Sequence, residues 1–131
     1  MISTRGRYAV RVMIDLAQHN DGSYIPLKDI SERQEISKKY LEIIMKNLVS
    51  AGMVTGVSGK GGGYKLTKKP KEYTIGQILD ATEDSLAPVA CLEKGAAPCP
   101  RAKNCKTLPM WAEFDAITRK FFNSKKLSSL L

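Results

Sequence analysis

Three cysteines are the residues of this sequence best suited to chemistry. Cys91, Cys99 and Cys105 lie within one 15-residue stretch, with seven residues between the first two and five between the last two. Thiolates are the soft ligands that iron–sulfur clusters and zinc prefer. Cations inside or beside the stretch would stabilise thiolates and offset the negative charge of a cluster; they are Lys94, Arg101, Lys103 and Lys106. The pattern favours one prosthetic group held by three sulfurs.

Other uses of the cysteines match the spacing less well. Structural zinc usually has four ligands in closely spaced pairs, and no such pairs are present. A redox pair needs two cysteines rather than three, and inert cysteines would lie on apolar, periodic helices. Zinc, thiol redox chemistry and inert thiols remain alternatives to an iron–sulfur cluster. The sequence leaves open whether such a cluster is 2Fe–2S or 4Fe–4S.

The composition excludes several classes of protein. The chain has 131 residues, of which 43% are hydrophobic and 26% charged, as in ordinary globular domains. No apolar run approaches the roughly 18 residues of a membrane span, and no apolar leader follows the N-terminus. We therefore expect a cytoplasmic protein without a membrane partner, and no enzyme motif is apparent.

The charge points to a polyanionic partner. Lys and Arg number 21 against 13 Asp and Glu, a net charge of +8, and the first 70 residues hold 12 basic and 6 acidic side chains. Neutralising phosphates with basic residues releases counterions, which favours nucleic-acid binding. The alternative is a solvated surface that is merely basic.

Closely spaced helices dominate the first 70 residues. Apolar periodicity predicts helices over 5–19 and 27–34. A third helix begins after Ser37, a favourable N-cap, and ends before Gly52. Its apolar face is predicted to comprise Leu41, Ile44, Met45, Leu48 and Val49. The tight turn at 34–36 indicates a helix-turn-helix, with an ordinary antiparallel helix pair as the alternative.

A hairpin is predicted directly after the third helix. Strands over 53–58 and 64–67 flank 59–63, where four glycines in five residues require a turn. A hairpin in this place is typical of the wing of a winged helix. Its glycine-rich tip can approach a phosphate or a narrow groove closely, while Lys60 supplies charge.

The rest of the chain alternates helix and loop. Thr74 and Gln77 form a capping box for a helix that ends near residue 84, and 85–107 show no regular pattern. Thr107 is expected to cap a helix over 108–124, and a weaker short helix follows at 125–131. Large apolar residues on the long helix predict dimerisation with the same helix of a second chain. One face carries Met110, Phe114, Ile117 and Phe121, with Trp111 and Phe122 beside it. The residues assigned to dimerisation are Trp111, Phe114, Ile117 and Phe121. The alternative is packing entirely against its own domain.

Several of these motifs together resemble one known family. The segments are 3–10, 29–34, 36–37 with 40–42, 61–64 and the three-cysteine loop. They are similar to the IscR-like iron–sulfur cluster regulators, a group that includes the nitric-oxide-sensing NsrR and the iron-responsive RirA. The resemblance covers almost the whole chain. It implies a homodimeric winged-helix transcription factor whose cluster loop precedes the dimerisation helix.

The resemblance assigns roles to individual residues. It implies that Cys91, Cys99 and Cys105 ligate the cluster. It also places a set of side chains on the base-facing side of the recognition helix, namely Ser37, Lys39, Tyr40 and Glu42. Glu42 can accept a hydrogen bond from a cytosine amino group; a solvated helix face is the alternative for Tyr40 and Glu42. Phosphate contacts are expected from Arg5, Arg7, Lys38, Lys46 and Lys60, and wing contacts from Ser58 and Gly61.

The chain departs from the family pattern at the fourth cluster ligand and in the wing. Leu108 stands where IscR has a ligating histidine, and Arg7-Tyr8 where NsrR has a ligating aspartate from the partner chain. Ser58 replaces a wing arginine, so Lys60 must provide the charge there. The fourth ligand stays open, whether solvent, a small thiol, a residue of the partner chain or a side chain near the loop; the candidates near the loop are Glu83, Asp84, Glu93 and Asn104. His19, the only histidine, is interpreted as a surface residue at a helix end rather than as a ligand.

The sequence thus predicts a mainly α fold with a small β-hairpin. Residues 1–70 would form the winged helix-turn-helix DNA-binding domain. Residues 71–131 would carry the cluster loop, 85–107, and the dimerisation helix, 108–124. The expected function is repression at a palindromic operator under control of the cluster, for genes of cluster assembly or of iron and redox stress. Alternatives are a cluster-free regulator that senses through thiols or a partner, and a thiol oxidoreductase or electron-transfer protein.

Overall fold

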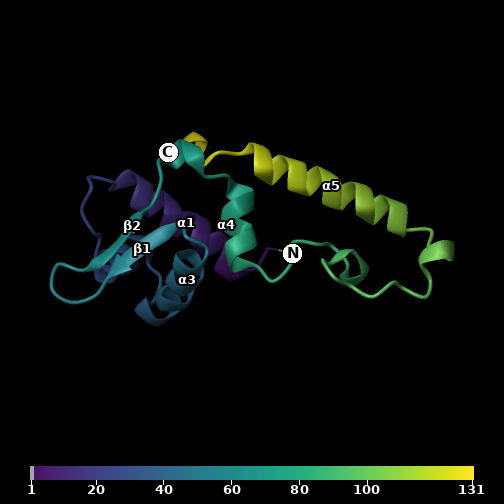
Figure 1. Ribbon diagram of the computed structural model, residues 1–131, viewed down its shortest axis with the longest axis horizontal. Coiled ribbons are helices and arrows are strands. Elements are labelled where there is room, and N and C mark those ends of the chain that lie inside the picture. The colour runs from purple at the N-terminus through teal and green to yellow at the C-terminus, as the bar shows by residue number, and fades with distance from the viewer. Residues whose placement is uncertain (1) are drawn as a thin grey trace.

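The computed structural model describes residues 2–131 and shows an elongated molecule, with a helical head at one end and the cysteine loop at the other (Figure 1). The head consists of four helices and one hairpin: α1 (Thr4–Gln18), α2 (Leu27–Gln34), α3 (Lys38–Ser50), β1 (Val54–Val57), β2 (Gly63–Leu66) and α4 (Ile75–Thr82). A fifth helix, α5 (Leu108–Ser124), runs from the cysteine loop back to the head. Short 3-10 turns occur at Pro70–Glu72, Ala90–Leu92, Ala102–Asn104 and Leu127–Leu130.

Local sequence signals predicted the position of α3 correctly. The Ser37 hydroxyl accepts a hydrogen bond from the backbone N–H of Tyr40 at 3.2 Å, which satisfies a free donor of the first turn. Ile36 and Leu41, on either side of this cap, are both buried and form a hydrophobic staple. Gly52 has a φ of +73° just past the end of α3. The predicted helix-turn-helix is therefore confirmed.

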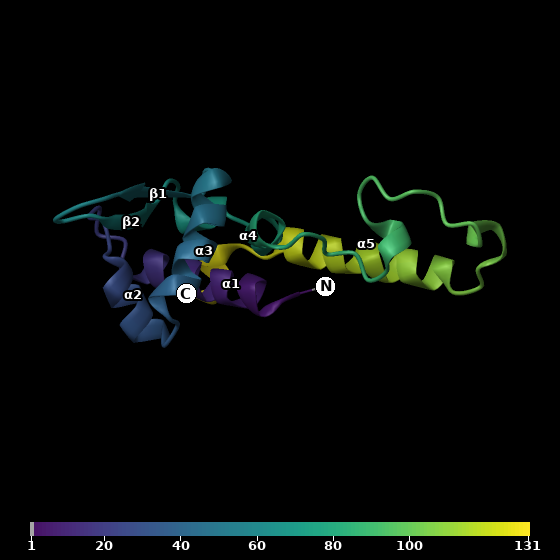
Figure 2. The same cartoon turned by 90° about the horizontal axis from the view of Figure 1, so that it is seen from below.

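The hairpin is fastened to the loop between α1 and α2. β1 and β2 pair antiparallel with Val54 opposite Leu66. The backbone N–H groups of Ile25 and Tyr64 each donate to the other residue's carbonyl, at 2.8 and 2.9 Å. A Cβ on Gly63 would come within 2.2 Å of the Ile25 carbonyl oxygen, so only glycine permits this close approach. Figure 2 shows the resulting wing projecting from the head at the end opposite the cysteine loop.

Among the described residues, one continuous hydrophobic core lies in the head and includes residues on both sides of position 70. Fully buried side chains come from both sides of that position, with Met13, Leu41 and Leu48 before it and Ile78 and Leu127 after it. α4 therefore belongs physically to the head rather than to a second domain. The division at residue 70 separates proposed roles and not two independent cores.

Tyr73 joins the hairpin to α4 through its buried hydroxyl. The hydroxyl donates to the Met53 carbonyl at 2.8 Å and accepts from the backbone N–H groups of Thr67 and Lys68 at 3.0 and 2.9 Å. These bonds satisfy a polar group that is 1% exposed. The predicted capping box follows at once, with Thr74 and Gln77 exchanging bonds at 3.1 and 3.0 Å.

Three details of the sequence analysis need correction. Val49 was assigned to the apolar core face of α3, yet it is 42% exposed, because it lies at the edge of the buried stripe. Thr107 occupies the N-cap position of α5 without a side-chain capping bond. Residues 85–107 are not wholly irregular, since two 3-10 turns interrupt the loop.

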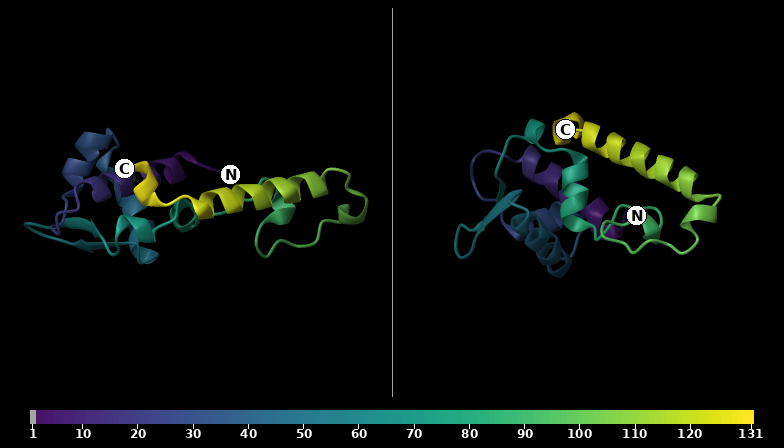
Figure 3. Two further views of the ribbon diagram at one scale, coloured as in Figure 1. Left: turned by 90° about the horizontal axis from the view of Figure 1, so that it is seen from above. Right: turned by 45° about the vertical axis from the view of Figure 1, so that its right-hand side comes forward.

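α5 is attached to the head at its C-terminal end only. Phe122 packs against the core, and Leu127, just beyond the helix, is fully buried. The backbone N–H of Ile75 donates to the Lys125 carbonyl at 2.8 Å, and that of Leu127 donates to the Tyr73 carbonyl at 3.0 Å. The two views of Figure 3 show the rest of α5 extending away from the head.

A buried carboxylate holds α2 against α1. Asp15 is 1% exposed and accepts hydrogen bonds from Arg33 at 2.9 and 3.0 Å and from Gln34 at 2.9 Å. Burial by itself raises the pKa of the Asp15 carboxyl. The hydrogen bonds from Arg33 and Gln34 and the Arg33 charge outweigh burial, so the net pKa is lower than the ordinary value. Arg11 extends the network by donating to the Gln34 side-chain and backbone oxygens.

We predict that Asp15→Ala lowers the free energy of unfolding by about 3 kcal/mol, because it removes one partner of a buried ion pair. Glu32→Gln, on the exposed side of α2, should change it by less than about 0.5 kcal/mol. The folded-state pKa of Asp15 lies below the unfolded one, so its contribution is complete above pH ~4 and is lost as the pH falls further. Urea melts from pH 7 to pH 3 measure this, and equal destabilisation by the two variants would contradict it.

Candidate nucleic-acid interface and cysteine loop

The face of α3 that points away from the core carries two of the predicted base contacts, Lys39 and Glu42, and two of the predicted phosphate contacts, Lys38 and Lys46. Lys38, Lys39, Glu42 and Lys46 are all exposed, while the opposite face of the helix is buried. Three lysines and a carboxylate on one helix face can pair with phosphates and with base edges. The exposed face also includes Ile43, 49% exposed, which sequence reasoning had not singled out. The sequence did contain a signal for this residue, namely its helical spacing from Lys39 and Lys46, which places it between them on the helix surface.

Two of the predicted base-facing residues have structural partners as well. Ser37 caps α3, so its oxygen is already accepting a bond while its O–H remains a donor. Tyr40 is half-buried and meets Tyr8 edge to face, with ring centroids 5.8 Å apart. The Arg11 guanidinium lies over the other aromatic ring, 5.0 Å from the Tyr8 centroid. Tyr40 is thus held by α1 and is not a freely solvated side chain.

The wing tip presents the second predicted contact region. Ser58, Lys60 and Gly61 are exposed, and Gly59 and Gly61 adopt positive φ angles of 90° and 77°. A surface groove separates the wing from α3 and is lined by residues of both, including Glu42, Lys46, Val57 and Ser58. The structure therefore places three of the predicted contact residues, Glu42 and Lys46 of α3 and Ser58 of the wing, on the two sides of one groove.

The predicted phosphate ligands at the N-terminus have different surroundings. Arg7 is exposed and donates to the Thr4 hydroxyl at 3.0 Å. Arg5 instead turns toward the end of α4, where its Nε donates to the Thr82 carbonyl at 2.6 Å and its guanidinium lies 3.6 Å from Asp84. A cation that binds a C-terminal carbonyl of a helix stabilises that helix end. These contacts make Arg5 a structural residue of the head.

A second link joins the start of α1 to the end of α4. Glu83 accepts hydrogen bonds from the backbone N–H and the hydroxyl of Ser3, at 2.7 and 2.9 Å. Gly6 leaves the space for this carboxylate, since a Cβ there would lie 2.0 Å from Glu83 Oε1. The link sits immediately before the cysteine loop. It pairs residues 80 positions apart, and local sequence patterns gave no signal for it.

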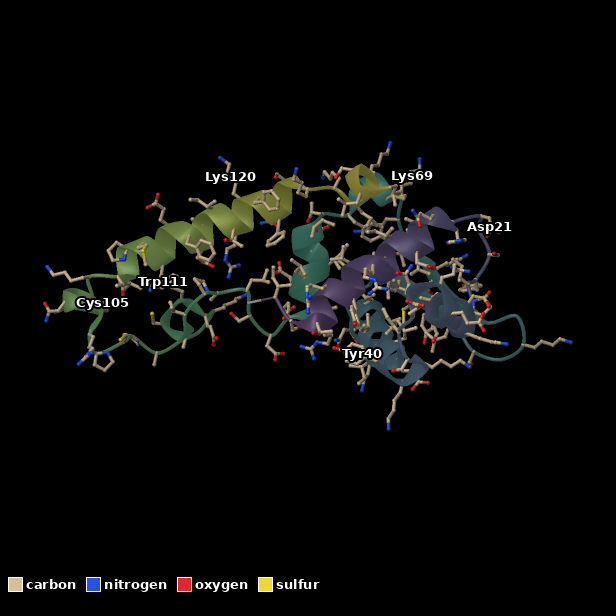
Figure 4. The ribbon with its side chains drawn as sticks, turned by 180° about the vertical axis from the view of Figure 1, so that it is seen from behind. Asp21, Tyr40, Lys69, Cys105, Trp111 and Lys120 are labelled. Atoms are coloured by element: carbon tan, nitrogen blue, oxygen red, sulfur yellow. The ribbon has the colours of Figure 1, made fainter. Side chains whose placement is uncertain are left out.

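The three cysteines are all free thiols in the loop at the far end of the molecule. Cys91 is exposed and Cys99 and Cys105 are half-buried. Figure 4 shows Cys105 at the end of the molecule opposite Asp21. Within residues 2–131, no three Cys, His, Asp or Glu side chains are gathered closely enough to hold a metal ion. The loop therefore carries the predicted ligands without bringing their sulfurs together.

Cys105 has the surroundings of a good thiolate ligand. Its sulfur lies 3.5 Å from the Thr107 hydroxyl, at the N-terminal end of α5. Hydrogen bonding to that hydroxyl, and then to the backbone N–H groups of Thr107 and Leu108, lowers the pKa of the Cys105 thiol, with a smaller effect from the Arg101 charge. The Thr107 side chain thus contacts the cysteine rather than capping the helix.

The chemistry of this donor set fits an iron–sulfur cluster. Three free thiols, one with a lowered pKa, share a loop with several cations, and this is the environment that favours thiolate ligation. Of the residues considered as a fourth ligand, Asn104 lines the same surface pocket as Cys105. Glu83 and Asp84 are engaged by Ser3 and Arg5. Glu93 lines a pocket with both of them.

His19 is in the wrong place for a ligand. Its Nδ1 lies 2.8 Å from the Asp15 carbonyl at the C-terminal end of α1. Asp21, two residues further on, is at the opposite end of the molecule from Cys105 (Figure 4).

None of the described residues forms a helix long and apolar enough to cross a membrane.

Comparison with known proteins identifies the family. A family model described as "Rrf2: Iron-dependent Transcriptional regulator" matches residues 2–131. The IscR transcriptional regulator of Vibrio atlanticus is 37% identical over 130 residues, which cover 99% of this chain and 74% of that protein. The chain belongs to the Rrf2 family of transcriptional regulators. A further relative is the protein rrf2 of Nitratidesulfovibrio vulgaris, 36% identical over 99% of this chain and 86% of its own length.

Solved structures of Rrf2-type regulators have the same fold. CymR, described as the global cysteine regulator of B. subtilis, superimposes with a TM-score of 0.78 at 32% identity, over 99% of this chain and 95% of that one. IscR of T. potens gives a TM-score of 0.75 at 30% identity, over 99% and 85% of the two chains. This Rrf2 protein is therefore an IscR-like, winged-helix DNA-binding transcriptional regulator, as the sequence had predicted.

We predict that Gly6→Ala lowers the free energy of unfolding by about 1–3 kcal/mol, because the added methyl displaces the Glu83 carboxylate from Ser3. Glu83→Ala removes the clash, so the double variant should be less destabilised than the sum of the two single variants. Urea melts of the wild type, the two single variants and the double variant give the four free energies of a double-mutant cycle. Strict additivity would show that Gly6 and Glu83 do not interact.

Proposed function

We propose that this Rrf2 regulator is a homodimeric repressor whose binding to a palindromic operator is controlled by an iron–sulfur cluster on Cys91, Cys99 and Cys105. The observation that carries the proposal is that three free cysteines lie on the one loop that joins the DNA-binding head to α5. A change in the conformation of that loop would therefore act on both the head and α5, which it connects. The genes controlled would be those of cluster assembly or of iron and redox stress.

The outward face of α5 supports the homodimer. Met110, Phe114, Ile117 and Phe121 are 41–60% exposed and follow one another at the spacing of a coiled-coil seam. Trp111 is half-buried and meets Phe114 edge to face, so it would support the seam rather than form it. Large apolar surface of this kind is unfavourable in water. A second copy of α5 would cover it symmetrically.

Two heads on such a dimer would read two half-sites. Each α3 would enter a major groove through Ser37, Lys39, Tyr40 and Glu42, while Ser58, Lys60 and Gly61 of the wing reach the flanking minor groove or backbone. Lys38 and Lys46 border α3 and would hold phosphates, as would Arg7. The two-fold axis of the dimer makes the operator palindromic.

The cysteine loop would act as the sensor. A bound cluster supplies a redox-sensitive, iron-dependent link between the three thiolates. Cys105, three residues before the start of α5, would fix the near end of that helix, and Cys91 would fix the segment of the loop that follows α4. A shift of α4 would be transmitted to α1 through the hydrogen bonds that Ser3 donates to Glu83. A bias of about 1.4 kcal/mol between two poses of the heads changes operator affinity tenfold.

We predict that Cys99→Ala abolishes the visible absorption of protein reconstituted anaerobically with iron and sulfide, because the remaining two thiols cannot hold the cluster. The variant should still elute as a folded dimer, since Cys99 lies outside the core. Its operator affinity should be the same before and after reconstitution. Ser85→Ala, in the same loop but without a thiol, is the matched control and should keep both colour and response.

We predict that Ile117→Asp converts the dimer to a monomer, because it places a charge in the centre of the apolar seam. Ala116→Asp adds the same charge to the exposed helix surface beside the seam and should leave the dimer intact. Light scattering coupled to size-exclusion chromatography gives the mass. A dimeric Ile117→Asp protein would refute the assignment of this interface.

A second candidate is a cluster-free regulator that senses through thiols or a partner protein. It is favoured by the separation of the three sulfurs, by the lowered pKa of Cys105, and by the similarity to CymR. The two candidates differ in one measurement. Protein that stays colourless after anaerobic reconstitution, yet loses operator binding on mild thiol oxidation, would support the second and exclude the first.

A further inference from the structure

We propose that Ile43 on α3 recognises a thymine methyl group in the major groove and so sets the operator sequence at one position of each half-site. The inference rests on the proposed function, since it requires that α3 enter the major groove. It adds a specificity-determining residue to the polar contacts already assigned. The resemblance assigned no role to this position.

Packing in the head does not explain why residue 43 is an isoleucine. It is 49% exposed, whereas its neighbour Ile44 is fully buried in the core. Among the described residues, Ile43 belongs neither to the core cluster nor to the partly buried side chains packed against it. It also lies outside the lining of the groove between α3 and the wing, which includes Val49. A large aliphatic side chain is thus held toward solvent by a helix whose other face is rigidly packed.

The neighbours of Ile43 suggest what covers it. On a helix, positions i−4 and i+3 lie beside position i, and here these are Lys39 and Lys46, both exposed. A patch of aliphatic surface between two cations is suited to a partner that is anionic at its edges and apolar at one point. Duplex DNA is such a partner, because phosphates border a groove in which the thymine C5-methyl is the apolar group that varies with sequence.

The position within α3 agrees with this partner. Ile43 is the sixth residue of α3 and lies one turn beyond Lys39, in the N-terminal half of the helix. That half is the part of a recognition helix that contacts base edges. Glu42, immediately before it, is exposed and can accept from a cytosine amino group. The pair would therefore distinguish neighbouring base pairs by two different physical means, a hydrogen bond and an apolar contact.

The size of the effect follows from the area of one methyl group. Removing a methyl from water contributes about 0.8 kcal/mol, which corresponds to about a fourfold change in affinity for each half-site. Deoxyuridine differs from thymidine only by that methyl and keeps the same hydrogen-bonding groups. Replacing one by the other in the operator therefore tests the apolar contact alone.

The experiment begins with a duplex selected from a random pool by the full-length protein, in both the reconstituted and the metal-free form. Each thymine of the selected operator is then replaced by deoxyuridine, symmetrically in the two half-sites. We expect one position at which the wild-type protein loses about 16-fold in affinity, fourfold per half-site. Ile43→Ala should bind the original operator more weakly and be insensitive to that replacement.

Val49→Ala is the matched control, because Val49 is exposed on the same helix but faces the wing groove. It should keep the wild-type sensitivity to deoxyuridine. A position that affects wild type, Val49→Ala and Ile43→Ala equally would overturn the inference, as would a wild-type protein insensitive at every thymine. Failure to enrich any sequence over random DNA is a different result and would refute the proposed function itself.

Discussion

The helix-turn-helix of this molecule is held in place by a carboxylate that water scarcely reaches. Asp15 accepts three hydrogen bonds from Arg33 and Gln34, the last residues of α2, and so fixes the turn that leads into α3. The direction in which α3 presents its lysines, Glu42 and Ile43 depends on this attachment to α1. Because α1 also carries Tyr8, which supports Tyr40, one helix sets both the tilt and one side-chain position of the reading surface. The proposed recognition of DNA by α3 therefore depends on an interaction that itself would not contact the DNA.

The elements that local chemistry determines were predictable from the sequence. Apolar periodicity, the Ser37 cap and the Thr74–Gln77 capping box involve residues a few positions apart, and the structure contains all of them. The errors arose where tertiary context decides. Val49 fits the helical period but lies where α3 faces an open groove. The contacts of Arg5 with the end of α4 join residues far apart in the sequence, so no local pattern indicated them. Gly6, Glu83 and Tyr73 gave no usable pattern, because their partners are distant in sequence.

The cysteine site was predictable in its chemistry and not in its geometry. Three soft ligands in a basic loop indicate what the loop could bind, and the structure shows that the three thiols are free. Binding of a cluster stays a proposal. How the sulfurs approach one another depends on backbone conformations of a loop that only short 3-10 turns constrain. The fourth ligand is harder still, because residue types alone cannot say which oxygen or nitrogen comes near. The positions of Asn104, Glu83 and His19 narrow that choice only after the fold is known.

The attachment of α5 at one end has an energetic consequence. Since the loop from 85 to 107 contributes few side chains to the core, its ordering is thermodynamically separable from folding of the head. Bridging Cys91 to Cys105 closes a ring of about 15 residues, an entropy loss on the order of 3 kcal/mol that any ligand must overcome. Affinity for that ligand can thus be tuned by loop stiffness, through proline and glycine content, without weakening the rest of the protein. Sensitivity and stability can vary independently in such a chain.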